Sequence, residues 1–285
     1  MIKKISKELN LIYPKNDIEA YILYPKYNIV YNKLEIAKFQ NLNCNPLPIL
    51  PNKYPIIIKP IINLLGMGLN AKKIKTEKQL DKYLTSGFFW CEYLDGKHYS
   101  WDLILKEGKI IYYTTFQGYK KTFGTFSKWI EEKREMIDII EKMIEYYLSD
   151  FTGSVNIETL NDKIIEVHLR LGDIDFSNDE IIKLALLNIN KLDITQQLKI
   201  VMNLEYKPLY LIPLWQKLDK ITDIKKTFKI IKKFEKEIIN NDLIRGYYFD
   251  DINHPNPDKY KRWLLLIGYN QKEIYKLINK IKKNL

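Results

Sequence analysis

The chain has 285 residues, of which 46% are hydrophobic, and this is enough to bury the core of one or two domains. No apolar stretch reaches 18 residues and no secretory signal is readable at the start, so the sequence predicts neither a membrane partner nor an exported protein. Two cysteines, Cys44 and Cys91, are too few for a disulfide framework and lack metal-ligand spacing, which favours a cytoplasmic location.

The net charge of +11 is carried mainly by lysine. Isoleucine, asparagine and tyrosine are also abundant, and all four residue types have A/T-rich codons, so genome composition is the simplest explanation of the excess. No nucleic-acid recognition motif accompanies the charge, and the sequence therefore argues against a nucleic-acid partner. Arginine is scarce, and we single out its four positions, Arg134, Arg170, Arg245 and Arg262.

The first third of the chain is expected to mix extended segments with short helices. Residues 20–31 read as extended, and 33–41 as a short amphipathic helix. A proline-rich connector leads to a buried strand at 54–62 and a glycine-containing turn at 64–71. Residues 76–84 are predicted to form a helix that Thr76 caps.

The middle of the chain predicts an antiparallel sheet with interspersed helices, an α+β arrangement. Strands are expected at 88–94, 98–105 and 110–116, and a helix at 128–148. A hairpin is expected from 154–160 and 163–169. Helices are then predicted at 178–203, and the remainder reads as β-α-β-β-α, with elements at 209–215, 222–239, 243–249, 261–269 and 270–283.

The hairpin carries the strongest chemical pattern. On paired strands Glu158 and Glu166 can face the same side, and two adjacent carboxylates repel unless a cation lies between them. Mg²⁺ prefers oxygen ligands and also retains phosphate oxygens, so it is the usual solution. Arg170 lies four residues after Glu166 and could clamp a phosphate or acyl phosphate. The alternative is an exposed strand face with ordinary acid–base pairs.

A second pattern is Tyr54-Pro55-Ile56-Ile57-Ile58-Lys59-Pro60. A lysine that ends an apolar strand needs an anionic partner or access to water. Gly66 and Gly68 follow, and their backbone amides could approach a phosphate without interference from a Cβ atom. The alternatives are a lysine that reaches solvent at a sheet edge, and two glycines that serve ordinary turns.

These segments together resemble the ATP-grasp superfamily. The terminal hairpin reads Asn156-Ile157-Glu158 and Ile165-Glu166-Val167-His168-Leu169-Arg170, and the resemblance assigns Glu158 and Glu166 to metal and Arg170 to phosphate. It also assigns Lys59 to the ATP phosphates, and Gly66 and Gly68 to a flexible loop. The run from Trp90 to Ser100 resembles the hinge that meets adenine through Glu92, Tyr93 and Leu94, and Asn32-Lys33 resembles a motif whose lysine reaches a phosphate.

Three features depart from the family pattern. His168 stands where a metal-binding asparagine is usual, and it could be a ligand, a substrate contact or a proton carrier, or could turn away. Imidazole suits Mn²⁺ or Zn²⁺ better than Mg²⁺. His98 replaces the acid that meets the ribose. Only 31 residues precede the Asn32-Lys33 motif, where the family usually has a sizeable domain.

The resemblance implies two α/β subdomains that clamp a nucleotide, with a small additional C-terminal α/β subdomain. The expected divisions are a short N-terminal segment, 1–31, a nucleotide- and metal-binding region, 32–175, and a C-terminal subdomain, 176–285. In that subdomain Arg245 and Arg262 are candidates for contact with an anionic acceptor.

The resemblance implies a ligase that uses ATP and Mg²⁺, or Mn²⁺, to activate a carboxylate as an acyl phosphate. Its substrates would be a small-molecule or peptide carboxylate and an amine or other nucleophile, and a homo-oligomer is compatible with the sequence. The expected residues are Arg170 and His168 for catalysis, and Glu158 and Glu166 for metal. Those for nucleotide are Lys33, Lys59, Gly66, Gly68, Glu92, Tyr93, Leu94 and His98. An ATP-binding pseudoenzyme or regulatory protein is the alternative, and a basic nucleic-acid-binding protein is a third.

Overall fold

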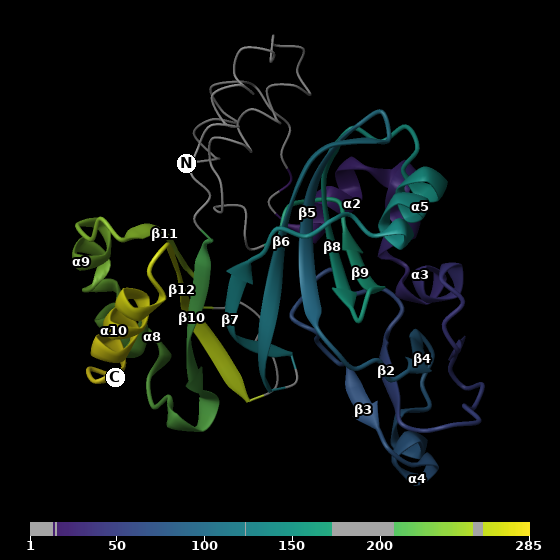
Figure 1. The fold of residues 1–285 in the computed structure, drawn as a ribbon. Coiled ribbons are helices and arrows are strands. Elements are labelled where there is room, and N and C mark those ends of the chain that lie inside the picture. The colour runs from purple at the N-terminus through teal and green to yellow at the C-terminus, as the bar shows by residue number, and fades with distance from the viewer. Residues whose placement is uncertain (1–13, 15, 123, 173–207, 253–258) are drawn as a thin grey trace. The chain divides into compact units, whose positions relative to one another are not determined.

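The computed structural model describes residue 14 and residues 16–122, 124–172, 208–252 and 259–285. The chain divides into two compact units (Figure 1). Unit 1 comprises Met1–Thr115 and Lys133–Leu204, and unit 2 comprises Phe116–Glu132 and Glu205–Leu285. The segment 116–132 is therefore grouped with the C-terminal part of the chain rather than with its neighbours in sequence.

Unit 1 contains a small antiparallel sheet in the order β1-β4-β2-β3. The strands are β1 (Cys44–Pro46), β2 (Ile56–Pro60), β3 (Lys72–Ile74) and β4 (Phe88–Glu92). β-Branched Ile56 and Ile58 point into a core with Trp90 and Leu80, and Leu80 belongs to α4 (Glu77–Leu80), which η2 (Asp81–Tyr83) follows. The strands predicted at 54–62 and 88–94 are thus confirmed, and the expected helix at 76–84 is reduced to these two short turns.

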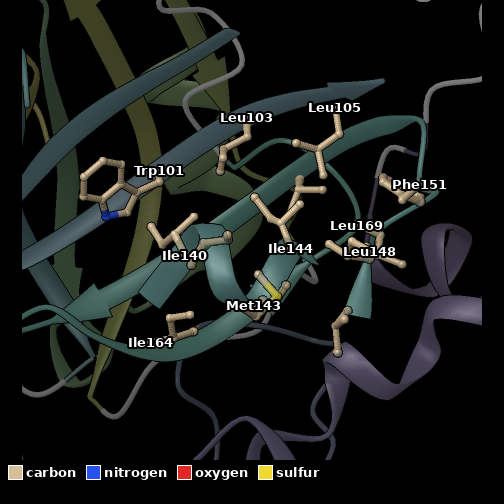
Figure 2. Close-up of a cluster of buried hydrophobic side chains, with 14 of the residues drawn as sticks. Trp101, Leu103, Leu105, Ile140, Met143, Ile144, Leu148, Phe151, Ile164 and Leu169 are labelled. Atoms are coloured by element: carbon tan, nitrogen blue, oxygen red, sulfur yellow. The ribbon is translucent and has the colours of Figure 1, made fainter. Parts of the chain in front are cut away.

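The main core of unit 1 lies between a second group of strands and a helix. Those elements are β5 (His98–Lys106), β8 (Gly153–Leu160), β9 (Lys163–His168) and α5 (Asp138–Tyr147). Trp101, Leu103 and Leu105 of β5 pack with Met143 and Ile144 of α5, and all five are nearly free of solvent exposure (Figure 2). Ile157 of β8 and Ile164 of β9 are buried in the same core, which fixes the register of the β8–β9 hairpin and hence the positions of its charged residues.

The expectation that residues 20–31 are extended is wrong. They form the end of α2 (Asp17–Leu23) and a 3₁₀ helix, η1 (Pro25–Tyr31). The Asn16 side chain accepts the backbone N–H of Glu19 and caps α2. Pro25 is the first residue of η1, a position whose N–H has no partner within the helix, so proline fits there. The helix α3 (Lys33–Phe39) follows as predicted, with Asn32 as its cap.

The predicted helix at 128–148 is correct only in its second part, which forms α5. Residues 125–131 instead form β7 (Thr125–Glu131), which pairs with β6 (Lys109–Thr122). Trp129 stands opposite Gly118, where an added Cβ would lie 2.6 Å from the indole. The aromatic side chain therefore packs over the glycine, and this tertiary contact outweighs the local helical pattern. β6 contributes residues to both units.

Unit 2 has strands in the order β11-β12-β10-β7-β6 with helices packed against them. The β-α-β-β-α order predicted for the end of the chain is confirmed. The elements are β10 (Tyr210–Lys217), η3 (Leu218–Lys220), α8 (Ile224–Lys232), α9 (Glu235–Ile239), β11 (Ile244–Phe249), β12 (Tyr260–Gly268) and α10 (Gln271–Lys282). The helices predicted at 178–203 lie outside the described residues. In the described part of the chain, no helix is both long enough and apolar enough to cross a membrane.

One side chain covers the backbone of β9, the last strand in its sheet. The amide of Gln40 donates to the carbonyl of Ile164 at 2.6 Å and accepts the Ile164 N–H at 2.9 Å. Gln40 is buried, so its amide replaces the pair of bonds that a further strand would make. This contact holds the end of α3 against β9.

Candidate functional site

The candidate site is centred on Glu166, a residue of β9. Its Oε1 lies 2.5 Å from Nζ of Lys33, and both side chains are largely buried. Lys33 is the first residue of α3, and the Asn32 side chain caps this helix. The backbone N–H of Lys33 donates to the carbonyl of Ile61. The side chains of Lys33 and Glu166, both expected at the nucleotide site, thus meet in the structure although they are far apart in sequence.

A second carboxylate, Asp17, organises the residues at the end of β9 and just beyond it. Its Oδ1 lies 2.9 Å from Nδ1 of His168, and its Oδ2 accepts from Arg170 at 2.8 Å. The Tyr31 hydroxyl donates to Asp17 at 3.4 Å and accepts the backbone N–H of Leu169 at 3.0 Å. Asp17 is 2% exposed, so water does not compete for these contacts.

The charges of this group are mutually stabilising. Burial alone would raise the pKa of Asp17, but His168 and Arg170 outweigh it and hold that pKa well below its usual range. Burial would likewise lower the pKa of His168, and the carboxylates of Asp17 and Glu166 raise it instead. Burial opposes the charge of Glu166 too, yet Lys33 and then His168 lower its pKa to about 2.

Lys59, at the end of β2, also reaches β9. Its Nζ donates to the Ile165 carbonyl at 3.1 Å and lies 5.5 Å from the centre of the Phe89 ring. Burial and, after it, the nearby charge of Lys33 lower the pKa of Lys59 to about 8. The structure thus brings Lys33 and Lys59 together beside Glu166, with His168 and Arg170 following along the same strand end.

Glu158 and Glu166 are direct cross-strand partners in the β8–β9 hairpin. Their predicted juxtaposition on one face of the hairpin is therefore confirmed. Each carboxylate also has a protein nitrogen beside it. Oε2 of Glu158 lies 3.0 Å from Nε2 of His98, which is buried at the start of β5, and Glu166 pairs with Lys33.

These residues fit a divalent metal only in part. Two neighbouring carboxylates are suitable oxygen ligands for Mg²⁺ or Mn²⁺. His168 does not fit as a third ligand, because Nδ1 is bonded to Asp17 and a raised pKa favours the doubly protonated ring, which has no free lone pair. Among the residues that the structure describes, no three His, Cys, Asp or Glu side chains form a metal-binding group.

The segments expected to meet adenine and phosphate are arranged as follows. Oε1 of Glu92 accepts the backbone N–H of Asn43 at 2.8 Å, so one carboxylate oxygen ties β4 to the residue before β1. The Tyr93 ring lies 3.4 Å from Nζ of Lys73, and Leu94 follows β4 in the open chain between β4 and β5. Gly66 and Gly68 have φ values of 66° and 61°, the left-handed region that glycine adopts readily, within consecutive tight turns.

Two residues of the site were missed by the sequence reading, namely Asp17 and Tyr31. Both lie in the segment expected to be an extended or minor N-terminal piece. One available signal was the pair Asn16-Asp17, since asparagine followed by an acid is typical of a helix start.

The two arginines of unit 2 that were candidates for contact with an acceptor differ in their surroundings. Arg262 is buried and donates to Asp250 at 2.7 and 2.9 Å, which opposes its role as an acceptor contact, whereas Arg245 is exposed.

No protein-family model and no curated protein matches the sequence. Solved structures do match the fold. An L-amino acid ligase from Bacillus licheniformis aligns with a TM-score of 0.57 at 14% identity, over 99% of this chain and 75% of the ligase. An N5-carboxyaminoimidazole ribonucleotide synthetase from Thermotoga maritima gives 0.56 at 13%, over 99% and 78%. The ADP complex of the Staphylococcus aureus N5-carboxyaminoimidazole synthetase gives 0.58 at 14%, over 93% and 78%. The chain has an α+β, ATP-grasp-like fold.

Proposed function

We propose that this protein is an ATP-dependent ligase that joins a carboxylate to an amine or another nucleophile. The observation that carries the proposal is that Lys33 and Lys59 meet the paired Glu158 and Glu166 at β9 within an ATP-grasp-like fold. Arg170 lies two residues beyond the end of this strand. Solved structures with this fold include ligases crystallised with ATP or ADP. A cationic group next to paired carboxylates is suited to a metal-bound polyphosphate.

The proposed reaction has two steps. An oxygen of the substrate carboxylate attacks the γ-phosphorus of ATP, ADP leaves, and an acyl phosphate forms. An amine nitrogen then attacks the carbonyl carbon, inorganic phosphate leaves with the bonding pair, and the nitrogen loses a proton. Such catalysis depends mainly on position and on neutralisation of phosphate charge.

Each residue has a proposed part in this scheme. Lys59 and Lys33 bind ATP phosphates, and Lys33 leaves Glu166 when a metal–nucleotide complex arrives. Glu158 and Glu166 would hold Mg²⁺ or Mn²⁺, and the metal would neutralise the charge of the phosphates. Arg170 contacts the transferred phosphate, and Asp17 holds the His168 ring beside Glu166.

The adenine and ribose contacts complete the proposal. Tyr93 and Leu94 offer their backbone to the base, beside Glu92 at the end of β4. His98 faces the ribose hydroxyls when Glu158 turns to the metal. Gly66 and Gly68 supply backbone amides for the phosphates, since neither has a side chain to block the approach.

A nucleotide-binding protein without turnover is the second candidate. The observation that favours it is that both carboxylates already contact protein side chains, Lys33 at Glu166 and His98 at Glu158. Release of inorganic phosphate from Mg-ATP, measured with panels of carboxylic acids and amines, separates the two. Acid-dependent release supports the ligase, whereas nucleotide-dependent thermal stabilisation without release supports the second candidate. If the folded protein shows neither phosphate release nor stabilisation by nucleotide, both candidate functions are refuted.

A further inference from the structure

The positive charge of the chain is concentrated in unit 2. Residues 116–132 and 205–285 contain 21 Lys and Arg against 12 Asp and Glu. The rest of the chain contains 25 Lys and Arg against 23 Asp and Glu. A codon bias toward lysine acts on the whole gene, so it does not account for a difference between the two units. Unit 2 therefore has a basic character of its own.

One lysine of unit 2 lies over the ring of Tyr260, and two further lysines lie close to this pair. Nζ of Lys121, near the end of β6, lies 4.6 Å from the ring centre. Lys217 of β10 is the direct cross-strand partner of Tyr260 in β12, so both side chains lie on one face of the sheet. Lys282 ends α10. Partial loss of water lowers the pKa of Lys121, and the positive charges of Lys282 and Lys217 lower it further.

This cluster, Lys121, Lys217, Lys282 and Tyr260, has no counter-charge in the described part of unit 2. The ion pairs found there include Lys280 with Glu237 and Lys276 with Glu273, and none involves the three cluster lysines. All three are exposed. Like charges held together without acids weaken the folded state, and such an arrangement is typical of a place where an anion binds.

We propose that the cluster binds a nucleic-acid strand, with the lysines on phosphates and Tyr260 against a base. Lysines neutralise backbone phosphates, and an aromatic ring among them matches how single strands are bound. The excess of positive charge extends over the whole unit, which favours an extended polyanion over one phosphate group. An acidic protein would use the charges but not the ring. The proposal is independent of the ligase activity.

The test is fluorescence anisotropy of a labelled single-stranded RNA with the full chain, at several salt concentrations. The variant Lys121→Gln/Lys217→Gln/Lys282→Gln should bind at least about tenfold more weakly, and its slope of log K against log salt should be smaller by about 2, since each lost phosphate contact removes about 0.7. The matched control, Lys225→Gln/Lys229→Gln/Lys272→Gln, removes three exposed charges from α8 and α10 and should lose much less. An equal loss in both variants would overturn the proposal.

Two further comparisons identify the ligand and the ring. Saturating Mg-ATP should not displace the RNA, and polyglutamate should compete poorly. Displacement by Mg-ATP would place the RNA at the nucleotide site, and displacement by polyglutamate would make the cluster a site for acidic protein. Either result would overturn the proposal. Tyr260→Phe should retain binding and Tyr260→Leu should lose it. Equal affinities of these two variants would also overturn it.

The stability of the lysine variant distinguishes a binding role from a structural one. Because the cluster lysines repel one another, their replacement should raise the Tm by about 1–3 °C. A lower Tm would mean that the lysines stabilise the fold, and it would contradict the proposal even if RNA binding were also lost.

Discussion

Nδ1 of His168 lies 2.9 Å from Oδ1 of Asp17, and both side chains are buried. The other oxygen of the same carboxylate accepts from Arg170. One acid from α2 therefore holds an imidazole and a guanidinium at the end of β9, in the segment to which the resemblance assigns phosphate contacts. An imidazole anchored in this way presents its second nitrogen, Nε2, toward Glu166, whose Oε1 is 3.7 Å away.

Asp17→Asn should lower the pKa of His168, because the Asp17 carboxylate is one of two that raise it. The free energy of unfolding should fall by about 2–4 kcal/mol, since the variant leaves Arg170 without its buried partner. An NMR titration of the His168 ring and urea unfolding measure the two effects. Asp150→Asn is the control, because Asp150 pairs with Lys26 at the surface, and it should change neither quantity. An unchanged His168 titration in Asp17→Asn would contradict the pairing.

Lys59→Ala should weaken ATP binding by about 1–3 kcal/mol, because a charge-assisted contact to phosphate is lost. Calorimetric titration of the folded variant measures this. Lys53→Ala, which removes an exposed lysine from the preceding connector, is the matched control and should bind like the wild type. Full affinity in Lys59→Ala would remove Lys59 from the nucleotide site.

The pH dependence of ATP binding should also depend on Lys59. Its pKa of about 8 means that the free protein loses this positive charge as the pH rises past that value. The affinity should therefore decline above about pH 8, and binding there should take up a proton. Titrations in buffers of different ionisation enthalpy detect the proton. Lys59→Arg should move the decline to higher pH, and an unmoved profile would assign it to another group.

His168→Asn should strengthen Mg²⁺-dependent ATP binding about 3- to 10-fold, because it removes a positive charge next to Glu166. Asparagine also offers an oxygen ligand, as the usual family pattern does. Titration of ATP affinity against Mg²⁺ measures the change. Weaker metal dependence in the variant would mean that the imidazole itself supports the metal.

Glu166→Gln should flatten the acid side of the stability profile. The pKa of Glu166 is lowered from 4.5 to about 2, so its contribution is complete above the unfolded-state value and is lost as the pH falls toward the folded-state value. The wild type should lose stability between about pH 5 and pH 2, and the variant should lose less over that range. Urea unfolding at a series of pH values measures both curves, and parallel curves would contradict the assignment.

The sequence was most informative where the apolar pattern and the turn residues agree. The β8–β9 hairpin follows from alternating residues around Asn161-Asp162, both of which adopt positive φ, and so the pairing of Glu158 with Glu166 could be predicted. The strand before Lys59 follows from its β-branched run. These are local signals, and each needs only a short segment.

The remainder depends on contacts between distant segments. β7 forms because Trp129 packs over Gly118. Gly118 lies outside residues 128–148, so the helical pattern of that segment could not indicate this contact. Asp17 contacts His168 across 151 positions in sequence, and no periodic pattern of residues around Asp17 predicts such a contact. The salt-bridge partners Lys33 and His98 could be placed near the nucleotide only by resemblance, and nothing in the sequence indicated that they would pair with the two hairpin glutamates.

The Gln40 amide on β9 has a consequence for solubility. A strand at the end of a sheet offers free N–H and C=O groups to any other extended chain, and this is a common start of aggregation. Gln40 takes both groups of Ile164, and Lys59 takes the carbonyl of Ile165. The strand that carries Glu166 can thus remain accessible to a ligand while its outer edge offers less to a neighbouring molecule.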